Sequence, residues 1–167
     1  MGDIIIRRME IGDSEAVVDV LIDSWQTAYR GIVSDDCLDN LDRPSLIGRR
    51  KKQYKEYIVA LLDGKVAGYC WYKNDNSFSE DMAEADSEIV AIYVRPELER
   101  QGVGREMFLH AVDDLRKQGR RKMVIWCLKD NLRGRRFYEK MGGVPAGEHQ
   151  THIGNDDYDE VGFMFDI

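Results

Sequence analysis

Apolar residues in the first part of the chain recur at spacings that predict one strand followed by helices. Asp3–Met9 is an apolar run of strand length, and helical spacing follows over Asp13–Ala28, where Asp13 can serve as the N-cap. Asp35–Leu41 predicts a short helical turn. Pro44 can open a further helix that runs towards Tyr57.

Strands dominate the middle of the chain. Tyr57–Leu62 and Lys65–Tyr72 are strand-like runs separated by Asp63-Gly64, a strong hairpin signal. Asn74–Asp86 is polar and acidic and predicts a loop, and Ser87–Val94 is an apolar, β-branched strand.

Helices and strands alternate in the last third of the chain. Val103–Leu115 shows one apolar helix face, Met123–Leu128 is a strand and Asn131–Met141 is a helix closed by two glycines. Val144–His152 and Tyr158–Ile167 predict two final strands. This order of elements predicts a mixed α/β sheet with helices on its faces, in a single domain of residues 1–167.

Composition narrows the class of protein. The chain has 167 residues, 43% of them hydrophobic and 33% charged, with a net charge of −7. This is the composition of an ordinary globular domain, and the acidic balance argues against broad binding to nucleic acid or anionic membranes. No apolar run approaches the roughly 18 residues of a membrane span, and the N-terminus does not resemble a signal peptide. We therefore expect a cytoplasmic protein.

The cysteines and histidines give little sign of metal or disulfide chemistry. Cys37, Cys70 and Cys127 form no CxxC pair, and each lies in or near an apolar segment, so buried free thiols are expected. His149 and His152 lie three residues apart with no third ligand nearby, which predicts surface strand residues and no metal site.

Candidate chemistry begins after the strand Ser87–Val94, where two glycines, Gly102 and Gly104, precede a helix. A strand, a glycine loop and a helix start gather backbone N–H groups at the positive end of the helix dipole, which favours an anion, most often phosphate. A P-loop would need Lys where Arg105 stands, and a dinucleotide fingerprint would need a small residue at Met107. A glycine turn that only packs the helix on the strand remains the alternative.

A second motif lies one strand and one helix further along and reads Asn131-Leu-Arg-Gly134-Arg-Arg-Phe137-Tyr138-Glu-Lys-Met-Gly142. Together the two segments resemble the GNAT superfamily of acyl-CoA N-acyltransferases. That family carries Gln/Arg-x-x-Gly-x-Gly/Ala at the phosphate loop and Asn-x-x-Ala-x-x-Phe-Tyr-x-Lys-x-Gly later. The early stretch Trp25–Ile32 and the element order extend the resemblance over nearly the whole chain.

The resemblance implies the GNAT-type fold, an α/β architecture with a mixed, mostly antiparallel sheet of about seven strands and about four helices. It implies an N-acetyltransferase that uses acetyl-CoA as co-substrate and transfers the acetyl group directly to a primary amine of a small molecule or peptide. One alternative is a catalytically silent acyl-CoA-binding module. Another, which the net charge opposes, is a nucleic-acid-binding domain using the basic stretch Arg116–Arg136.

The resemblance also assigns roles to residues. Tyr138 is expected to protonate the departing thiolate, and Glu88 to accept the amine proton directly or through water. The alternatives are a core aromatic for Tyr138 and a solvated strand-edge glutamate for Glu88. Asn131 is expected to hydrogen-bond the pantetheine arm. The other coenzyme-binding residues implied are the strand end and the loop: Ile92, Tyr93, Val94, Arg100, Gln101, Gly102, Val103, Gly104 and Arg105.

Glu99 departs from the family motif. It stands where the motif has Gln or Arg, so we expect this carboxylate to face solvent or an arginine.

Trp25, Tyr29 and Tyr72 are candidate walls of an acceptor site. The acids near them would suit a cationic amine, although solubility residues of loops are the alternative: Asp35, Asp36, Glu80, Asp81 and Glu84. A homodimer is expected from the resemblance alone.

Overall fold

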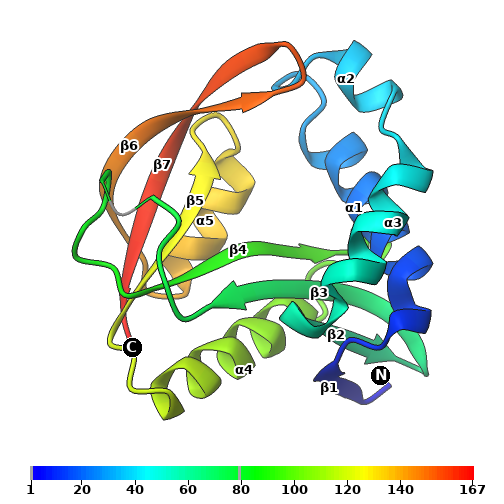
Figure 1. Cartoon of the computed structure of the whole chain (residues 1–167), viewed down its shortest axis with the longest axis horizontal. Coiled ribbons are helices and arrows are strands. Elements are labelled where there is room, and N and C mark those ends of the chain that lie inside the picture. The colour runs from blue at the N-terminus through cyan, green and yellow to red at the C-terminus, as the bar shows by residue number, and fades with distance from the viewer. Residues whose placement is uncertain (1, 79) are drawn as a thin grey trace. The chain divides into compact units, whose positions relative to one another are not determined.

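The structure is a computed structural model that describes residues 2–78 and 80–167, so Met1 and Ser79 of the predicted loop lie outside the described residues. Within them the chain forms five α-helices, three short 3₁₀-helices and seven strands (Figure 1). The helices are α1 (Ser14–Ala28), α2 (Asp35–Asp39), α3 (Arg43–Gln53), α4 (Val103–Lys117) and α5 (Leu132–Lys140), with η1 (Ile11–Asp13), η2 (Tyr54–Glu56) and η3 (Pro96–Leu98). The strands are β1 (Ile4–Arg8), β2 (Tyr57–Leu62), β3 (Lys65–Lys73), β4 (Ser87–Val94), β5 (Lys122–Leu128), β6 (Val144–Ile153) and β7 (Asp156–Asp166).

The strands pair in the order β1-β2-β3-β4-β5-β7-β6. β4 runs parallel to β5, whereas β1–β2, β2–β3, β5–β7 and β6–β7 are antiparallel. The predicted mixed, mostly antiparallel sheet of about seven strands is confirmed. The fifth α-helix is the short α2, which the sequence predicts as a helical turn over Asp35–Leu41.

The described residues fall into two compact units. Unit 1 comprises residues 1–71 and 91–111, and unit 2 comprises residues 72–90 and 112–167.

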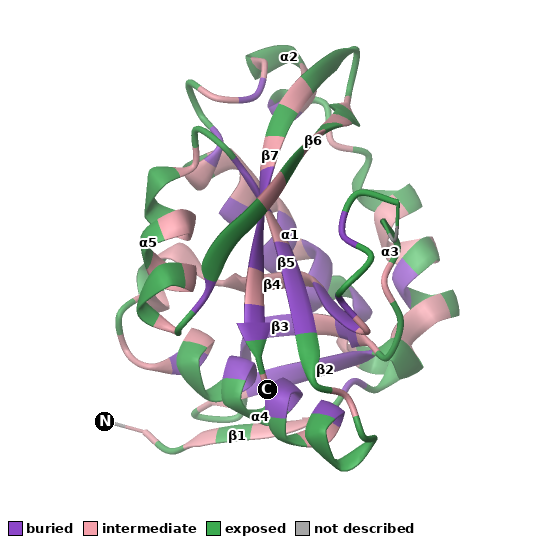
Figure 2. Cartoon of the chain, turned by 90° about the vertical axis from the view of Figure 1, so that its left-hand side faces the viewer, coloured by how far each residue is buried: buried purple, intermediate pink, exposed green. Residues whose placement is uncertain are grey.

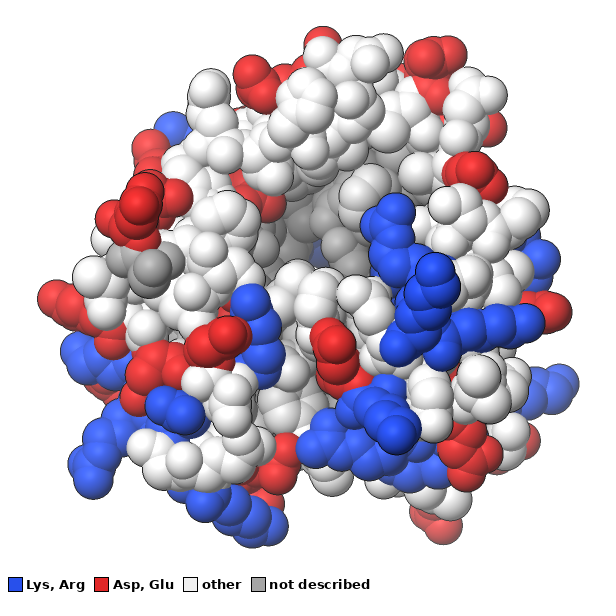
Figure 3. Space-filling model, viewed as in Figure 1, with Lys and Arg blue, Asp and Glu red and all other residues white. Residues whose placement is uncertain are grey.

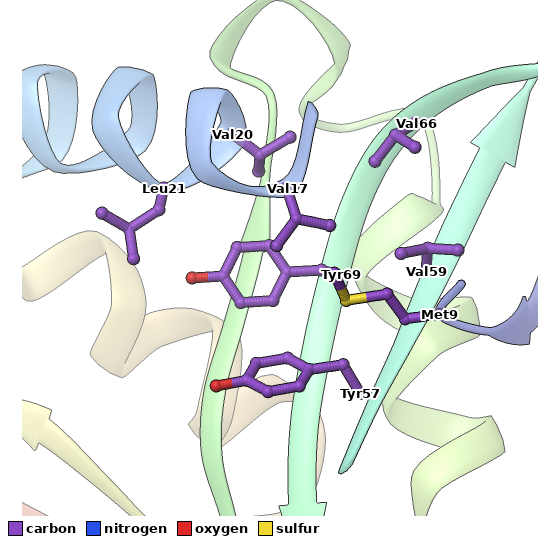
Figure 4. Packing of buried hydrophobic residues seen from close by; sticks show 8 residues of the cluster. All are labelled: Met9, Val17, Val20, Leu21, Tyr57, Val59, Val66 and Tyr69. Carbon is purple, nitrogen blue, oxygen red and sulfur yellow. The ribbon is translucent and has the colours of Figure 1, made fainter. Parts of the chain in front are cut away.

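The core of unit 1 forms where α1 packs on β2 and β3. Val17, Val20 and Leu21 are spaced so that they lie on one helix face, and they pack with Tyr57 of β2 and Tyr69 of β3 (Figure 4). Met9, Val59 and Val66 complete this cluster. The β2–β3 hairpin turns at Asp63-Gly64, where φ is +51° and +74°. Two successive positive φ values are the type I′ geometry that this dipeptide predicts.

The sheet of unit 2 has two different faces. On one face α5 packs against β7, where the rings of Tyr138 and Phe163 lie 5.8 Å apart. On the other face Met82 and Ala85, from the segment between β3 and β4, pack on Val124 of β5. Figure 2 shows β5 buried over most of its length, whereas β6 alternates between exposed and intermediate residues.

The cysteines are free thiols in the described structure, with Cys70 and Cys127 buried and Cys37 partly exposed. Burial raises the pKa of Cys127 to about 12 and that of Cys70 further still. Both thiols therefore stay protonated at neutral pH, which removes them as candidate nucleophiles.

Gly68 of β3 marks a close approach inside unit 1, and its replacement gives a stability prediction. A Cβ at Gly68 would lie 2.6 Å from the backbone oxygen of Tyr93 and 2.9 Å from Cε of Met107. We expect Gly68→Ala to lower the free energy of unfolding by about 1–3 kcal/mol, because the β4 backbone must shift. Urea unfolding measures this. The control Gly48→Ala lies in α3 with no atom within 4 Å of the added Cβ, and should raise stability by up to about 1 kcal/mol.

Candidate active site

The loop between β4 and α4, in unit 1, has the backbone geometry of an anion site. Arg100 has φ +63° and Gly102 has φ +90°, and at the start of α4 the Glu106 N–H donates to Gly102 O at 3.0 Å. Alternating left-handed residues turn successive N–H groups towards one side, and the first N–H groups of a helix have no acceptor within the helix. The loop Arg100–Arg105 can therefore hold a phosphate through its backbone.

Glu99, the departure from the family motif, closes η3 with an extended conformation, φ −64° and ψ 156°. It is partly exposed, and the exposed Arg100 follows it at the left-handed position. Its backbone therefore belongs to the entrance of the loop. The expectation that its carboxylate faces solvent or an arginine stays a prediction.

Ile92, Tyr93 and Val94 at the end of β4 are partly exposed residues. The Val94 carbonyl already accepts a hydrogen bond of 3.0 Å from the hydroxyl of Ser24 on α1. In unit 2 the register of β4 with β5 runs from Ser87↔Met123 to Ile89↔Ile125, and β4 then continues to Val94. The parallel register given for β4 with β5 therefore stops before this strand end, and the pairing of Ile92–Val94 with a ligand arm stays a prediction.

Asn131 of unit 2 is the N-cap of α5. Its side-chain oxygen accepts from Gly134 N–H at 3.1 Å, so the amide NH₂ is the donor that remains for a ligand. A Cβ at Gly134 would lie 2.6 Å from Asn131 Nδ2 and 3.2 Å from Cys127 Sγ. Glycine in place of the family's alanine therefore fits the way this asparagine folds over the helix.

Tyr138 lies on α5 and is partly exposed. Its ring stands 5.6 Å from Phe137 and 5.8 Å from the fully buried Phe163. The ring is thus anchored on the sheet of unit 2 by packing that a phenylalanine would keep.

Glu88 is buried in unit 2, where it is 3% exposed. Its Oε2 accepts a hydrogen bond of 3.0 Å from Ser77 N–H, and the ammonium of Lys73 lies 3.8 Å from the same atom. The alternative of a solvated strand-edge glutamate is wrong. One N–H donor and one lysine therefore fix the position of this buried carboxylate, and its role as a base stays a prediction.

His149 is the main difference from the sequence expectation. Its side chain is 7% exposed, so the prediction of a surface residue is wrong for His149, although it holds for His152, which is 65% exposed. The ring stacks on Trp126 at 3.7 Å and lies between two carboxylates: Nδ1 is 3.0 Å from Asp81 Oδ2 and Nε2 is 2.7 Å from Glu160 Oε2. His149 thereby ties the segment between β3 and β4 to the β6–β7 hairpin.

The acceptor-wall candidates divide between the units. In unit 1 Trp25 packs edge-on against Tyr29 at 5.3 Å, and the hydroxyls of Tyr29 and Tyr93 are 3.2 Å apart. In unit 2 the Tyr72 hydroxyl donates to Asp114 of α4 at 2.6 Å. The Tyr72 hydroxyl therefore binds a residue of α4, whereas Trp25 and Tyr29 lie beside the end of β4.

The predicted acids have local roles. Asp35 pairs with Arg30, Asp36 accepts from Asn40, and Glu84 lies 3.6 Å from the ammonium of Lys122. Within the described part of the chain, no group of three or more His, Cys, Asp and Glu side chains is arranged to hold a metal ion. None of the described helices has both the length and the apolar character needed to cross a membrane.

Comparison with known proteins places these observations in a family. The model of the Acetyltransferase (GNAT) family matches residues 18–143, which include the glycine loop, Asn131 and Tyr138. The chain belongs to the GNAT family.

The relatives of this GNAT chain are N-acetyltransferases. It is 27% identical to the uncharacterized N-acetyltransferase YuaI of Bacillus subtilis over 128 residues, which cover 75% of this chain and 72% of YuaI. It is 23% identical to a spermidine N(1)-acetyltransferase of Thermoplasma acidophilum, with 82% and 86% covered. The crystal structure of the PaiA N-acetyltransferase of that organism, in complex with coenzyme A, shares the fold with a TM-score of 0.73, 20% identity and 99% coverage of both chains.

His149, whose burial the sequence does not predict, gives a stability prediction that depends on pH. Burial raises the pKa of Glu160 above its ordinary 4.5, and His149 acts against that rise. A carboxyl with a raised folded-state pKa contributes stability below pH 4.5, which is lost as the pH rises through the folded-state value. His149→Phe keeps the stacking on Trp126 but removes the partner of a buried carboxylate. We expect it to cost about 1–3 kcal/mol of unfolding free energy at about pH 7.

Urea unfolding at about pH 4 and about pH 7 tests this, and the cost of His149→Phe should be smaller at the lower pH because Glu160 is then neutral. The matched control is His152→Phe, whose exposed pair with Asp157 should change stability by less than about 0.5 kcal/mol. An equal cost at both pH values would show that Glu160 does not carry the effect.

Proposed function

We propose that the chain is an acetyl-CoA-dependent N-acetyltransferase that transfers the acetyl group directly to a primary amine. The observation that supports this best is the left-handed loop at Arg100 and Gly102, directly before α4. Its N–H groups suit the pyrophosphate of coenzyme A. Membership of the GNAT family and a relative named spermidine acetyltransferase support the amine acceptor.

The residues that would hold acetyl-CoA fit its chemistry. The loop residues Arg100–Arg105 bind phosphate through N–H groups, Arg105 adds a positive charge, and the backbone at Ile92–Val94 can pair with the pantetheine arm as an added strand. The Asn131 NH₂ donates to an amide oxygen of that arm. When bound, acetyl-CoA supplies an acetyl group on a thioester.

The remaining residues move protons. The Glu88 carboxylate accepts the proton of the acceptor ammonium, directly or through water, so that the nitrogen lone pair is free to attack. A backbone N–H of β4 near Ile92 stabilises negative charge on the carbonyl oxygen. Tyr138, a phenol whose ordinary pKa is about 10, donates its hydroxyl proton to the departing sulfur.

Two measurements test the proposal. Isothermal titration with acetyl-CoA is expected to give a dissociation constant of tens of micromolar or below, roughly −6 kcal/mol or stronger. Thiol release with a panel of primary amines is expected to exceed the rate without amine for at least one acceptor. Absence of binding would remove the coenzyme site. Binding without thiol release for any amine would favour the silent acyl-CoA-binding module.

A further inference from the structure

Unit 1 holds a set of buried polar atoms that lack hydrogen-bond partners among the described residues. They are the indole Nε1 of Trp25, Nε of Arg50 and the hydroxyls of Tyr57 and Tyr69. Buried polar atoms in native proteins are almost always paired, so an unpaired group calls for an explanation, such as a ligand that is not present. Four of them in one unit, all able to donate, form what we call the Arg50 group.

Arg50 is the unusual member. It lies in the last turn of α3, is 8% exposed, and its guanidinium carbon stands 5.1 Å from the centre of the Tyr57 ring. No carboxylate lies within 4 Å of its nitrogens in the described residues. By contrast Arg7 pairs with Asp13 and Arg43 with Asp19, and both arginines are far more exposed. Buried charges are normally paired, so this guanidinium lacks its counter-ion.

The two phenols face the same way. Figure 4 shows the hydroxyls of Tyr57 and Tyr69 pointing to one side, away from Met9 and Val59. Their rings are 5.9 Å apart. Burial raises the pKa of both phenols, and most strongly that of Tyr69. The charge of Arg50 opposes the rise at both phenols, a side-chain interaction with Arg50 opposes it further at Tyr69, and Glu56 adds to the rise at Tyr57. Both hydroxyls therefore remain protonated donors.

Aromatic contacts connect the Arg50 group to the end of β4. The Tyr69 ring lies 5.6 Å from the Tyr93 ring, whose hydroxyl is 3.2 Å from that of Tyr29, and Tyr29 packs against Trp25 at 5.3 Å. Tyr93 belongs to the strand segment assigned above to the pantetheine arm. The Arg50 group is thus next to the segment where, under the proposed function, the acetyl group is presented.

We propose that the Arg50 group binds an oxyanion carried by the acceptor, so that the acceptor is a small amine with a carboxylate or phosphate group. This rests on the proposed function. A buried guanidinium, two phenol O–H groups and an indole N–H offer donors and one positive charge, which match an oxyanion and repel an ammonium. Figure 3 shows further Lys and Arg side chains over α3, whose last turn contains Arg50, Lys51 and Lys52, and their field favours an anion.

Matched pairs of acceptors test the inference. The pairs are L-phenylalanine with its α-amide and O-phosphoethanolamine with ethanolamine, and spermidine serves as a purely cationic amine. We expect the oxyanion-bearing member of at least one pair to give a kcat/KM for thiol release about ten- to a hundredfold higher. The pair that shows the preference identifies the oxyanion as carboxylate or phosphate. Equal or better turnover of spermidine and of the pair members that lack the oxyanion would overturn the inference.

Arg50→Met is expected to bring that ratio close to one, whereas Arg43→Met, on the exposed side of the same helix, should leave it unchanged. The melting temperature of Arg50→Met should equal or exceed that of the wild type, because an unpaired buried charge has been removed. A lower melting temperature with an unchanged ratio would make Arg50 structural and overturn the inference. Tyr57→Phe, which removes only the hydroxyl, should raise KM for the preferred acceptor severalfold while kcat is kept, and an unchanged KM would exclude Tyr57 from the site.

If no acceptor releases thiol, the proposed function fails, and the same pairs still test the site by binding. The melting temperature should then rise with L-phenylalanine or O-phosphoethanolamine and not with the matched amide or ethanolamine, and the rise should vanish in Arg50→Met. The absence of any such difference would overturn the Arg50 site independently of catalysis.

Discussion

Replacing Tyr138 by phenylalanine is expected to lower kcat for thiol release by about ten- to a thousandfold, because the variant removes the proton donor to the departing sulfur. The ring contacts with Phe137 and Phe163 do not involve the hydroxyl, so the helix should pack as before. The dissociation constant for acetyl-CoA, measured by isothermal titration, should stay within about threefold of the wild type, roughly 0.7 kcal/mol. A loss in kcat alone separates proton donation from binding.

The matched control is Tyr158→Phe, which removes a hydroxyl from a partly exposed tyrosine of β7. It should leave kcat unchanged. If Tyr138→Phe also leaves kcat unchanged, Tyr138 is a packing residue of α5 and another group protonates the sulfur. If it weakens acetyl-CoA binding and kcat together, its hydroxyl holds the coenzyme.

Much of the fold could be predicted because local signals and tertiary structure agree. Asp63-Gly64 predicts a tight hairpin, and both residues take the left-handed conformation that such a turn needs. The spacing of Val17, Val20 and Leu21 predicts one buried face of α1, and these three residues pack on β2 and β3. The glycine loop is similar, since Gly102 adopts a positive φ that other residues avoid.

The burial of the His149 side chain could not be predicted from the residues beside it along β6, because exposed and partly exposed positions alternate there. It follows from register. The turn at Gly154 pairs Ile153 with Asp156, and counting back along both strands sets His149 opposite Glu160. The sequence signal available for this pairing was the two-residue turn between Ile153 and Asp156, which sets the register of β6 and β7. The third partner, Asp81, comes from a segment without periodicity, so its contact with His149 depends on tertiary structure alone.

Arg50 is buried although it lies in a run of basic residues, a pattern that usually indicates a solvated helix face. Four consecutive charges, Arg49–Lys52, extend around a helix at about 100° per residue, so one of them must face inwards. Leu46 and Tyr54, four residues to either side of Arg50, both pack on the core of unit 1. This spacing of four marks Arg50 as the inward charge, and it is the sequence signal that points to the oxyanion site.

Gly104→Glu is expected to abolish acetyl-CoA binding, raising the dissociation constant by more than about a hundredfold, roughly 3 kcal/mol. Gly104 lies in the first turn of α4, next to the left-handed Gly102. A glutamate there adds bulk and a negative charge at the end of the helix that favours anions. Isothermal titration measures the loss, and an unchanged melting temperature shows that the variant is folded.

Two variants separate a local effect from a general one. Gly104→Ala adds only a methyl group, as the family motif allows, and should bind acetyl-CoA within about threefold of the wild type, roughly 0.7 kcal/mol. Gly12→Glu adds the same charge to an exposed position with no atom within 4 Å of the added Cβ, and should bind normally. Titrations of Gly104→Glu at low and high salt separate the two causes of its lost affinity for acetyl-CoA. Ions screen the repulsion between charges but do not relieve steric overlap. Partial recovery at high salt would assign the screened part to charge, whereas retained affinity in Gly104→Glu at low salt would place the phosphates away from this loop.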